Sequence, residues 1–222
     1  MVKIKKVRIP TKEEWAALIA VTGDNDDILH WGSIDSWCHD TDPKNPGCRI
    51  VAGREQHDSF GSENVLSRFE DLGFRPAFEV ENSDDLGPDG TIITVGTLVM
   101  NSKPVKVPET PVWDGDIPNY VPGASLAFET DPRAAGLQVQ AIKVGNILIA
   151  DRVLMARISW LDITKNFGGD DSETAICRGS MLYGLLDDCT DSFGPESARD
   201  EYEQGFWAGI LRVAEMLGFQ KI

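Results

Sequence analysis

The side chains that most often bind metals or act as nucleophiles are few in this chain. Cysteine occurs four times and histidine three times. No two cysteines have the Cys-x-x-Cys spacing of a zinc site, so Cys38 and the adjacent His39 form only a weak metal candidate. Cys38 and Cys48 flank a Pro/Gly turn, which leaves two alternatives, a local disulfide or free thiols. Because the basic N-terminus lacks the apolar run of a secretory signal, we expect free thiols.

Carboxylates are abundant, and their abundance weakens any catalytic interpretation. Asp24–Asp27 offers the oxygen ligands of a calcium loop but lacks the glycine and the distal glutamate of an EF-hand, so we interpret it as a solvated turn. Asp114, Asp116 and Asp151 could be paired for acid–base catalysis, but a chance grouping is expected in so acidic a chain. Neither a Gly-rich phosphate loop nor a serine nucleophile elbow is present. We expect no catalytic residue, no bound metal and no cofactor.

The composition is typical of a globular protein. The chain has 222 residues, of which 41% are hydrophobic, and its formal net charge is −15. That length suits one ordinary domain or two small ones. The acidic surface repels phosphate backbones, and no apolar window is long enough to span a bilayer. We therefore expect a soluble protein with neither nucleic-acid nor membrane partners.

Local sequence patterns predict one helix and two strands in the first half of the chain. Thr11–Glu14 has the form of a capping box, an apolar stripe follows it, and Gly23 is a plausible stop, so we expect a helix between them. Residues 28–50 read as irregular structure, in which only Ile50 begins a short strand. Residues 72–80 alternate as a strand does, with a proline that marks an edge or a bulge.

The second half has the pattern of β-hairpins. Residues 82–90 are almost all turn formers or acids, which marks a domain boundary. Beyond it, residues 91–100 and 105–107 read as two strands around a turn, and Gly145-Asn146 suits a two-residue hairpin connection. An amphipathic helix is predicted over 195–217. We therefore predict an α+β protein with one module at 1–81 and a β-rich domain at 82–222 closed by that helix.

Residues 53–72 contain a dense mixture of hydrogen-bond donors, acceptors and charges around one aromatic side chain. Adaptable polar side chains beside a rigid strand are typical of a recognition surface. A plain solvated loop is the alternative on composition alone. The candidate ligand-binding residues are Arg54, Gln56, His57, Asp58, Ser59, Phe60, Ser62, Glu63 and Asn64.

Two motifs give residues 8–80 a resemblance to a known family. Arg8–Trp15 (Arg-Ile-Pro-Thr-Lys-Glu-Glu-Trp) resembles the helix start of the formylglycine-generating enzyme superfamily, and Gly73-Phe74-Arg75 resembles its terminal strand. Between the motifs, the residues that fall in a similar order are Trp31, Trp37, Arg49 and Arg68. The stretch Arg49–Val80 is most similar to the variable segment of the proteins that diversity-generating retroelements alter.

The resemblance implies a C-type-lectin-like fold at 1–81, in which a small sheet and one or two helices support an irregular ligand surface. It implies scaffold roles for Trp15, Trp37, Phe74 and Arg75 and ligand contacts for the polar set at 53–72. The opening strands that usually precede the family's helix have no evident counterpart. By analogy with the variable proteins, we expect a non-catalytic protein that binds a protein or another macromolecule. It would act as a homo-oligomer or in a larger assembly, in the cytoplasm or on a phage particle.

Two alternatives stay open beside that expectation. The first is a divergent enzyme of the formylglycine-generating type, but the family's catalytic cysteine pair is missing from residues 53–72, and its Arg-Gly-Gly-Ser is Ala52-Gly-Arg-Glu55 here. Since Cu(I) requires soft sulfur ligands, the resemblance does not extend to copper-dependent oxidation. The second alternative is a structural, phage-associated assembly protein in which residues 53–72 form only a subunit contact.

Overall fold

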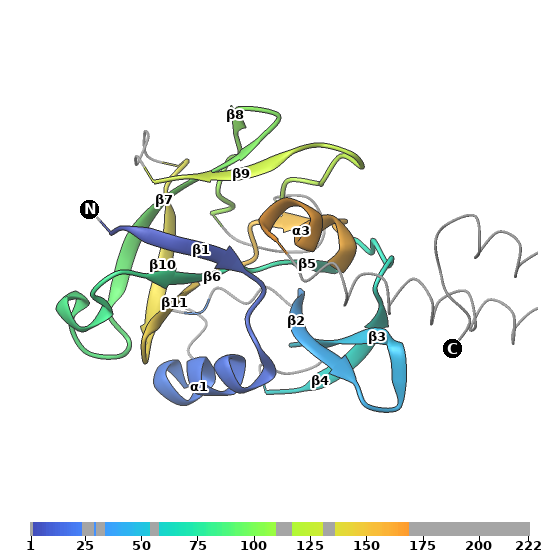
Figure 1. Cartoon of the computed structure of the whole chain (residues 1–222), viewed down its shortest axis with the longest axis horizontal. Coiled ribbons are helices and arrows are strands. Elements are labelled where there is room, and N and C mark those ends of the chain that lie inside the picture. Colours follow the sequence, from blue (N-terminus) through green and yellow to red (C-terminus); the bar gives the residue numbers. More distant parts are fainter. Residues whose placement is uncertain are drawn as a thin grey trace, which may run out of the picture. The chain divides into compact units, whose positions relative to one another are not determined.

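A computed structural model describes residues 2–23, 29, 34–53, 58–109, 117–130 and 136–168. All of these residues belong to one compact unit, Met1–Arg178. Within them the chain forms two β-sheets and two α-helices, which makes the architecture α+β (Figure 1). The predicted helix over 195–217 lies outside the described residues.

The larger sheet has seven strands, and it joins the beginning of the described chain to its later half. The strand order is β1-β6-β11-β10-β7-β8, and β9 pairs with β7 off this path. Every pairing in it is antiparallel. The strands are β1 (Ile4–Arg8), β6 (Ala77–Val80), β7 (Ile92–Met100), β8 (Lys103–Pro104), β9 (Leu126–Glu129), β10 (Val139–Val144) and β11 (Ile147–Ala150).

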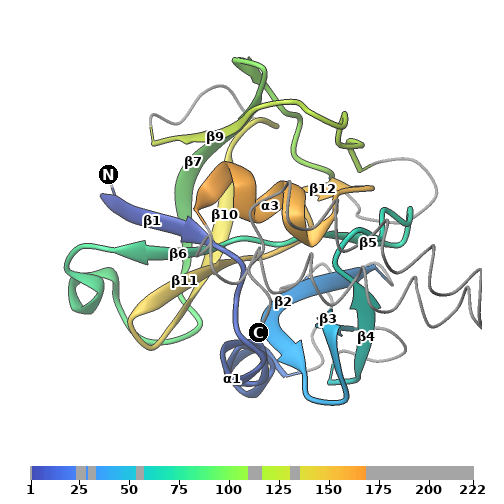
Figure 2. The same ribbon diagram turned by 45° about the vertical axis from the view of Figure 1, so that its right-hand side comes forward.

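The long strand β7 bends at Gly96 and changes partners there. Residues 92–96 pair with β10, whereas residues 97–100 pair with β9. Gly96 has φ +148°, and a Cβ placed on it would lie 2.2 Å from the carbonyl oxygen of Glu129. Only glycine fits so close an approach of two backbones. The bend lets the sheet curl into the half-barrel visible in both ribbon views (Figures 1 and 2).

The smaller sheet has five strands in the order β12-β5-β2-β3-β4. A parallel pairing joins β2 to β5, and the other pairings are antiparallel. The strands are β2 (Asp35–Asp42), β3 (Asn45–Ala52), β4 (Phe60–Asn64), β5 (Leu72–Phe74) and β12 (Met155–Ala156). In this order β4 occupies one edge of the sheet.

Both helices begin with a capping box. Helix α1 (Lys12–Thr22) starts at Thr11 and helix α3 (Trp160–Phe167) at Ser159, and each start is a complete capping box. The predicted first helix is therefore confirmed, including its end at Gly23. The second helix was not predicted, although the pattern of Ser159 followed three residues later by Asp162 could have shown it.

A buried arginine connects the two motifs on which the family resemblance rests. The guanidinium carbon of Arg75 lies 5.1 Å from the centre of the Trp15 ring. Arg75 Nη1 donates hydrogen bonds of 2.9 Å to the carbonyl oxygens of Leu29 and Asp151. Burial lowers the pKa of Arg75 to about 9, although the nearby Asp151 opposes that shift. The side chain stays protonated at neutral pH and ties β5 and β6 to α1.

The domain boundary predicted at residue 81 does not divide the described chain. Strand β6 ends at Val80, and its two neighbours in the sheet are β1, before the boundary, and β11, after it. Strands that are far apart in the sequence can be hydrogen-bonded neighbours in one sheet, so a turn-rich stretch between them need not separate domains. Here residues 82–90 form only a short 3-10 helix, η1 (Ser83–Leu86), and a turn.

Three further expectations are corrected by the strands. The segment read as irregular, 28–50, contains most of the β2–β3 hairpin, and residues 53–72 contain β4. A strand that the sequence did not reveal, β1, precedes helix α1. In the second half, the strand expected at 105–107 is replaced by β8, which begins directly after the Asn101-Ser102 turn. The Gly145-Asn146 connection is confirmed, because Val144 pairs directly with Ile147.

Candidate functional site

The candidate surface is built on β4, which carries four of the nine predicted ligand-binding residues, Phe60, Ser62, Glu63 and Asn64. Strand β4 is Phe-Gly-Ser-Glu-Asn, a sequence with little β propensity of its own. It is extended because β3 pairs with it along its whole length, from Cys48 opposite Asn64 to Ala52 opposite Phe60. The neighbouring strand therefore decides its conformation, and the sequence alone did not reveal it.

The two faces of the small sheet are covered by different helices. On one face Ala52 belongs to a core cluster with Trp15 and Leu18 of α1, and Phe60 packs against that cluster. On the other face Trp37 donates a 2.8 Å hydrogen bond from Nε1 to the carbonyl oxygen of Ile158, just before α3. The sheet is thus held rigidly between α1 and α3 (Figures 1 and 2).

Alternate side chains of β4 belong to these two faces. Phe60 and Ser62 are directly opposite Ala52 and Ile50, so they lie on the α1 face, where the Lys12 ammonium sits 4.7 Å from the centre of the Phe60 ring. Glu63 is opposite Arg49 and lies on the α3 face. The side chains of Phe60, Ser62 and Glu63 are half-buried on the two faces of the sheet. The outermost part of β4 is therefore its backbone edge, on the side away from β3.

On the α3 face, a buried arginine lies beneath Glu63. Arg49 is only 3% exposed, and its guanidinium carbon is 4.3 Å from the centre of the Trp160 ring. A guanidinium above an indole face is a favourable cation–π arrangement. It holds β3 against the first turn of α3 and fixes the position of the strand that carries β4.

The backbone hydrogen bonds at the two ends of β4 establish which residues face β3. Gly53 N donates to Ser59 O at 2.9 Å, and Val65 N donates to Gly47 O at 3.3 Å. In an antiparallel pair, hydrogen-bonded and non-hydrogen-bonded positions alternate. Odd-numbered residues of β4 therefore bond to β3, and the N–H and C=O groups of Phe60, Ser62 and Asn64 point away from it.

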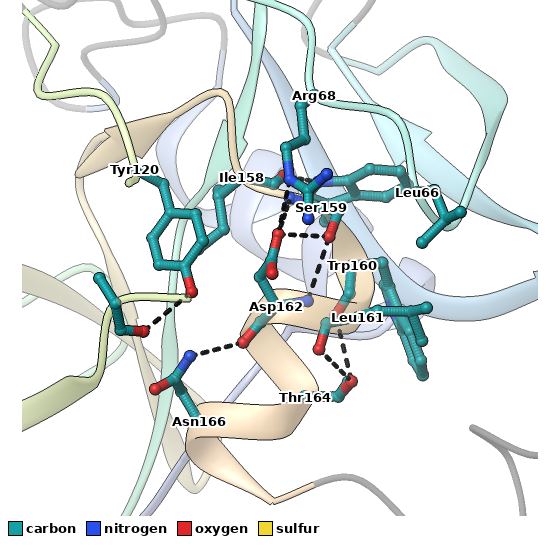
Figure 3. Close-up of polar contacts among 12 residues, drawn as sticks. Leu66, Arg68, Tyr120, Ile158, Ser159, Trp160, Leu161, Asp162, Thr164 and Asn166 are labelled. Carbon is teal, nitrogen blue, oxygen red and sulfur yellow. Dashed lines mark hydrogen bonds and ion pairs between the residues drawn. The ribbon is translucent and has the colours of Figure 1, made fainter. Parts of the chain in front are cut away.

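The turn after β4 presents apolar side chains beside ion pairs. Leu66 is 43% exposed and Phe69 is 50% exposed. Arg68 Nε donates a 2.8 Å hydrogen bond to Asp162 of α3, and Arg157 forms an ion pair with Glu70. Figure 3 shows Arg68 above the capping box and Leu66 standing to its side. Apolar side chains next to fixed charges are a common composition for a protein-binding surface.

The carboxylate of Asp162 anchors this turn to α3. Burial alone would raise the pKa of Asp162, but hydrogen bonds from Arg68 and from the Ser159 hydroxyl outweigh it and hold that pKa below its usual range. Ser159 Oγ donates to Asp162 Oδ2 at 2.5 Å, and Asn166 Nδ2 donates to the Asp162 carbonyl oxygen at 2.8 Å (Figure 3). The start of α3 and the turn that follows β4 thus share one charged group.

Further charge beside β4 comes from the β2–β3 hairpin, whose turn adjoins the Asn64 end of the strand. The Lys44 backbone N–H and then the Ser62 hydroxyl lower the pKa of Asp42, so this carboxylate stays ionised. Burial raises the pKa of Cys48, and the neighbouring charges of Asp42 and Glu63 raise it further. Cys48 and the buried Cys38 are free thiols. The thiol of Cys48 is therefore protonated at neutral pH.

The predicted site residues have different environments in the structure. Asp58 and Asn64 are exposed, whereas Ser59, Phe60, Ser62 and Glu63 are half-buried. Arg54, Gln56 and His57 lie outside the described residues. The Asn64 side chain closes the turn, since its Oδ1 accepts a 3.0 Å hydrogen bond from Leu66 N.

Sequence reasoning missed three contributors to this surface, Leu66, Phe69 and Lys12. Polar side chains dominate residues 53–72 and hide the signal of Leu66, although an isolated leucine in a polar turn indicates an exposed contact. Lys12 belongs to the first helix, and only the packing of α1 against the small sheet brings it to Phe60.

Within the part of the chain that the structure describes, no three His, Cys, Asp or Glu side chains are grouped as a metal site. In that same part, no helix has both the length and the apolar character needed to cross a bilayer. Comparisons with protein-family models, curated proteins and solved structures give no match to this chain.

Proposed function

We propose that this chain is a non-catalytic recognition protein, whose surface at residues 53–72 binds a macromolecular ligand. The proposal includes the C-type-lectin-like character of residues 1–81 and the similarity to the variable proteins of diversity-generating retroelements. The observation that carries the proposal is a contrast in burial between the scaffold residues and the candidate ligand-binding residues. Trp15, Trp37, Phe74 and Arg75 are fully buried, whereas Asp58–Asn64 are half-buried or exposed at a sheet edge.

The pairing of β1 with β6 supports the same proposal. These strands bring the two ends of the segment 4–80 together in antiparallel register, with Arg8 opposite Ala77. Arg8 then bonds to Glu79 of β6 and to Glu14 of α1 at distances of 2.6–2.8 Å. A segment closed at its ends can vary in the middle without loss of its frame, which suits a surface with replaceable side chains.

The test is a binding screen of the full chain against a phage-displayed library of random linear peptides and against a glycan array. We expect binders whose affinity falls at least about tenfold in Phe60→Ala and Glu63→Ala, because each substitution removes a central contact. Ile92→Ala is the matched control, since Ile92 is an exposed apolar residue on the larger sheet. Binders that are equally weakened by Ile92→Ala, or by none of these substitutions, would contradict the proposal.

The exposed Leu66 and Phe69 side chains favour a second candidate, a structural role in assembly. In that case the same turn is a contact between subunits. Sedimentation equilibrium of Phe60→Ala and Glu63→Ala distinguishes the two roles. A drop in oligomer mass supports assembly, whereas an unchanged mass with lost binding supports recognition.

A further inference from the structure

Strand β4 has an edge at which backbone groups are available for pairing. The N–H and C=O groups of Phe60 and Ser62 point away from β3, because hydrogen-bonded and outward positions alternate along the strand. Among the described residues, no backbone partner is present for them. Asn64 ends this edge, because its carbonyl oxygen already accepts a 2.8 Å hydrogen bond from Ser67 N.

This edge lacks three of the devices that usually prevent strand pairing. Exposed edges are commonly protected by lysine, by proline or by a bulge. Strand β4 contains neither lysine nor proline, and its register with β3 is continuous from Asn64 to Phe60. An edge without these three devices can accept an extended chain through main-chain hydrogen bonds.

The surroundings of the edge indicate the chemistry of what would pair with it. Asp42 bonds to Ser62, Asp58 precedes the strand and Glu63 belongs to it, so three carboxylates lie on or beside the edge, together with the Lys12 ammonium over the Phe60 ring. The whole chain carries a formal net charge of −15, which attracts cationic partners and repels a second copy. Leu66, at the end of the edge, offers an apolar contact.

We infer that β4 takes up an extended, positively charged polypeptide segment as an added strand along Phe60 and Ser62. This inference rests on the proposed function and names its ligand class. Main-chain hydrogen bonds to Phe60 and Ser62 supply affinity that is independent of side chains. The carboxylates and Leu66 supply the preference among sequences. A frame that tolerates changed side chains at 58–64 would keep this backbone contact in every variant.

The test compares Ser62→Pro with Ser62→Ala, using basic linear peptides selected on the full chain from the phage library. Both substitutions remove the hydroxyl that bonds to Asp42, but only proline removes the outward N–H. We expect Ser62→Ala to bind within about threefold of the wild type and Ser62→Pro to bind at least about tenfold more weakly. Circular dichroism and the thermal midpoint establish that both variants fold.

Amide hydrogen exchange of the wild-type chain gives a second measurement that needs no variant. Without peptide, the Phe60 and Ser62 amides should exchange faster than those of Gly61 and Glu63, and saturating peptide should slow them. Amides at 60 and 62 that are protected without peptide, or unprotected with it, overturn the inference.

The remaining outcomes separate this inference from the proposed function. Selected peptides that bind Ser62→Pro and Ser62→Ala equally, yet fail on Phe60→Ala, overturn strand addition and leave the recognition surface in place. The same holds if only glycans or acidic peptides bind. A dimer of the free chain that Ser62→Pro dissociates makes a second copy the occupant and overturns the peptide inference.

Discussion

Arg75 shows how a single residue holds together segments that are distant in the sequence. Its side chain is fully buried, and it bonds to carbonyl oxygens of Leu29 and Asp151 while it covers the Trp15 ring. A buried guanidinium is tolerated only where such partners replace water. The residue therefore stabilises the frame and does not belong to the ligand surface.

Arg75→Ala should lower the free energy of unfolding by about 3 kcal/mol or more, because it leaves buried carbonyl groups unpaired and opens a cavity beside Trp15. Urea denaturation of the full chain measures the change. Arg157→Ala is the control, since the exposed pair of Arg157 with Glu70 should contribute less than about 1 kcal/mol. Equal effects of the two substitutions would contradict the assigned role.

Among the elements, β7 and the two helices depend on features that can be tested separately. The bend of β7 requires glycine at position 96, where a Cβ would approach Glu129 O to 2.2 Å. The helix starts require carboxylates that stay ionised, Glu14 in α1 and Asp162 in α3. Gly96 thereby positions β9, and Asp162 positions the turn that follows β4.

Gly96→Ala should destabilise the protein by about 2–4 kcal/mol, because the new methyl group must displace backbone atoms. Gly123→Ala separates this steric effect from backbone strain. Gly123 also has a positive φ, of +85°, but nothing lies within 4 Å of the point that a Cβ would occupy there. We expect about 1 kcal/mol for Gly123→Ala. Thermal unfolding measures both, and a Gly123→Ala effect as large as that of Gly96→Ala would refute the steric argument.

Acid should destabilise the protein through the two helix starts. For Glu14, burial would raise the pKa, but hydrogen bonds from Arg8 and the Thr11 amide outweigh it, so this pKa is lowered, as is that of Asp162. A lowered pKa means that the folded state binds fewer protons than the unfolded state. The stabilisation is present above the unfolded pKa, about 4, and is lost as the pH falls through the folded value.

Asp162→Asn should therefore be less stable than the wild type by about 1–2 kcal/mol at pH 7. The difference should shrink below about pH 4, where the wild-type carboxyl group takes up its proton. Unfolding free energies measured between pH 7 and pH 3 give the comparison. A constant difference across that range would show that ionisation of Asp162 is irrelevant. Asp84→Asn, in η1, provides an exposed control.

An element could be predicted from the sequence where a few adjacent residues specify it, and could not where pairing with another strand decides its conformation. The α1 start and the Gly145-Asn146 hairpin are fixed by a few adjacent residues, and both were predicted. Strand β4 has no local signal, because its extended form comes from pairing with β3. Six of the nine predicted site residues, namely Asp58, Ser59, Phe60, Ser62, Glu63 and Asn64, fall in the described chain. That the backbone edge faces outward depends on register, which the sequence does not reveal.

The described chain does not follow the predicted two-module arrangement, because its first eighty residues bond to later ones. Strand β6 pairs with β11, the Trp37 indole bonds to Ile158 O, and Arg75 bonds to Asp151 O. Each of these contacts crosses the boundary expected at residue 81. The resemblance of residues 8–80 to a family of compact modules gave no indication of this dependence.

A fragment of residues 1–81 should therefore lack cooperative unfolding, since it leaves one side of β6 unpaired and buried donors without acceptors. Near-ultraviolet circular dichroism and urea denaturation check this expectation against the full chain. A fragment with native-like aromatic signals and a sharp transition would restore the independent module. The comparison uses the Trp15 and Trp37 signals, because both side chains are fully buried in the complete protein.

The hydrogen bond from Arg75 to Asp151 spans 76 residues of sequence, and this span has a consequence for synthesis in the cell. A ribosome that adds about 5–20 residues per second needs roughly 4–15 seconds to make that stretch. During this interval Arg75 lacks the carbonyl oxygen of Asp151 as an acceptor, and β6 lacks its neighbour β11. The frame around Arg75 can therefore close only after the later strands of this unit have been made.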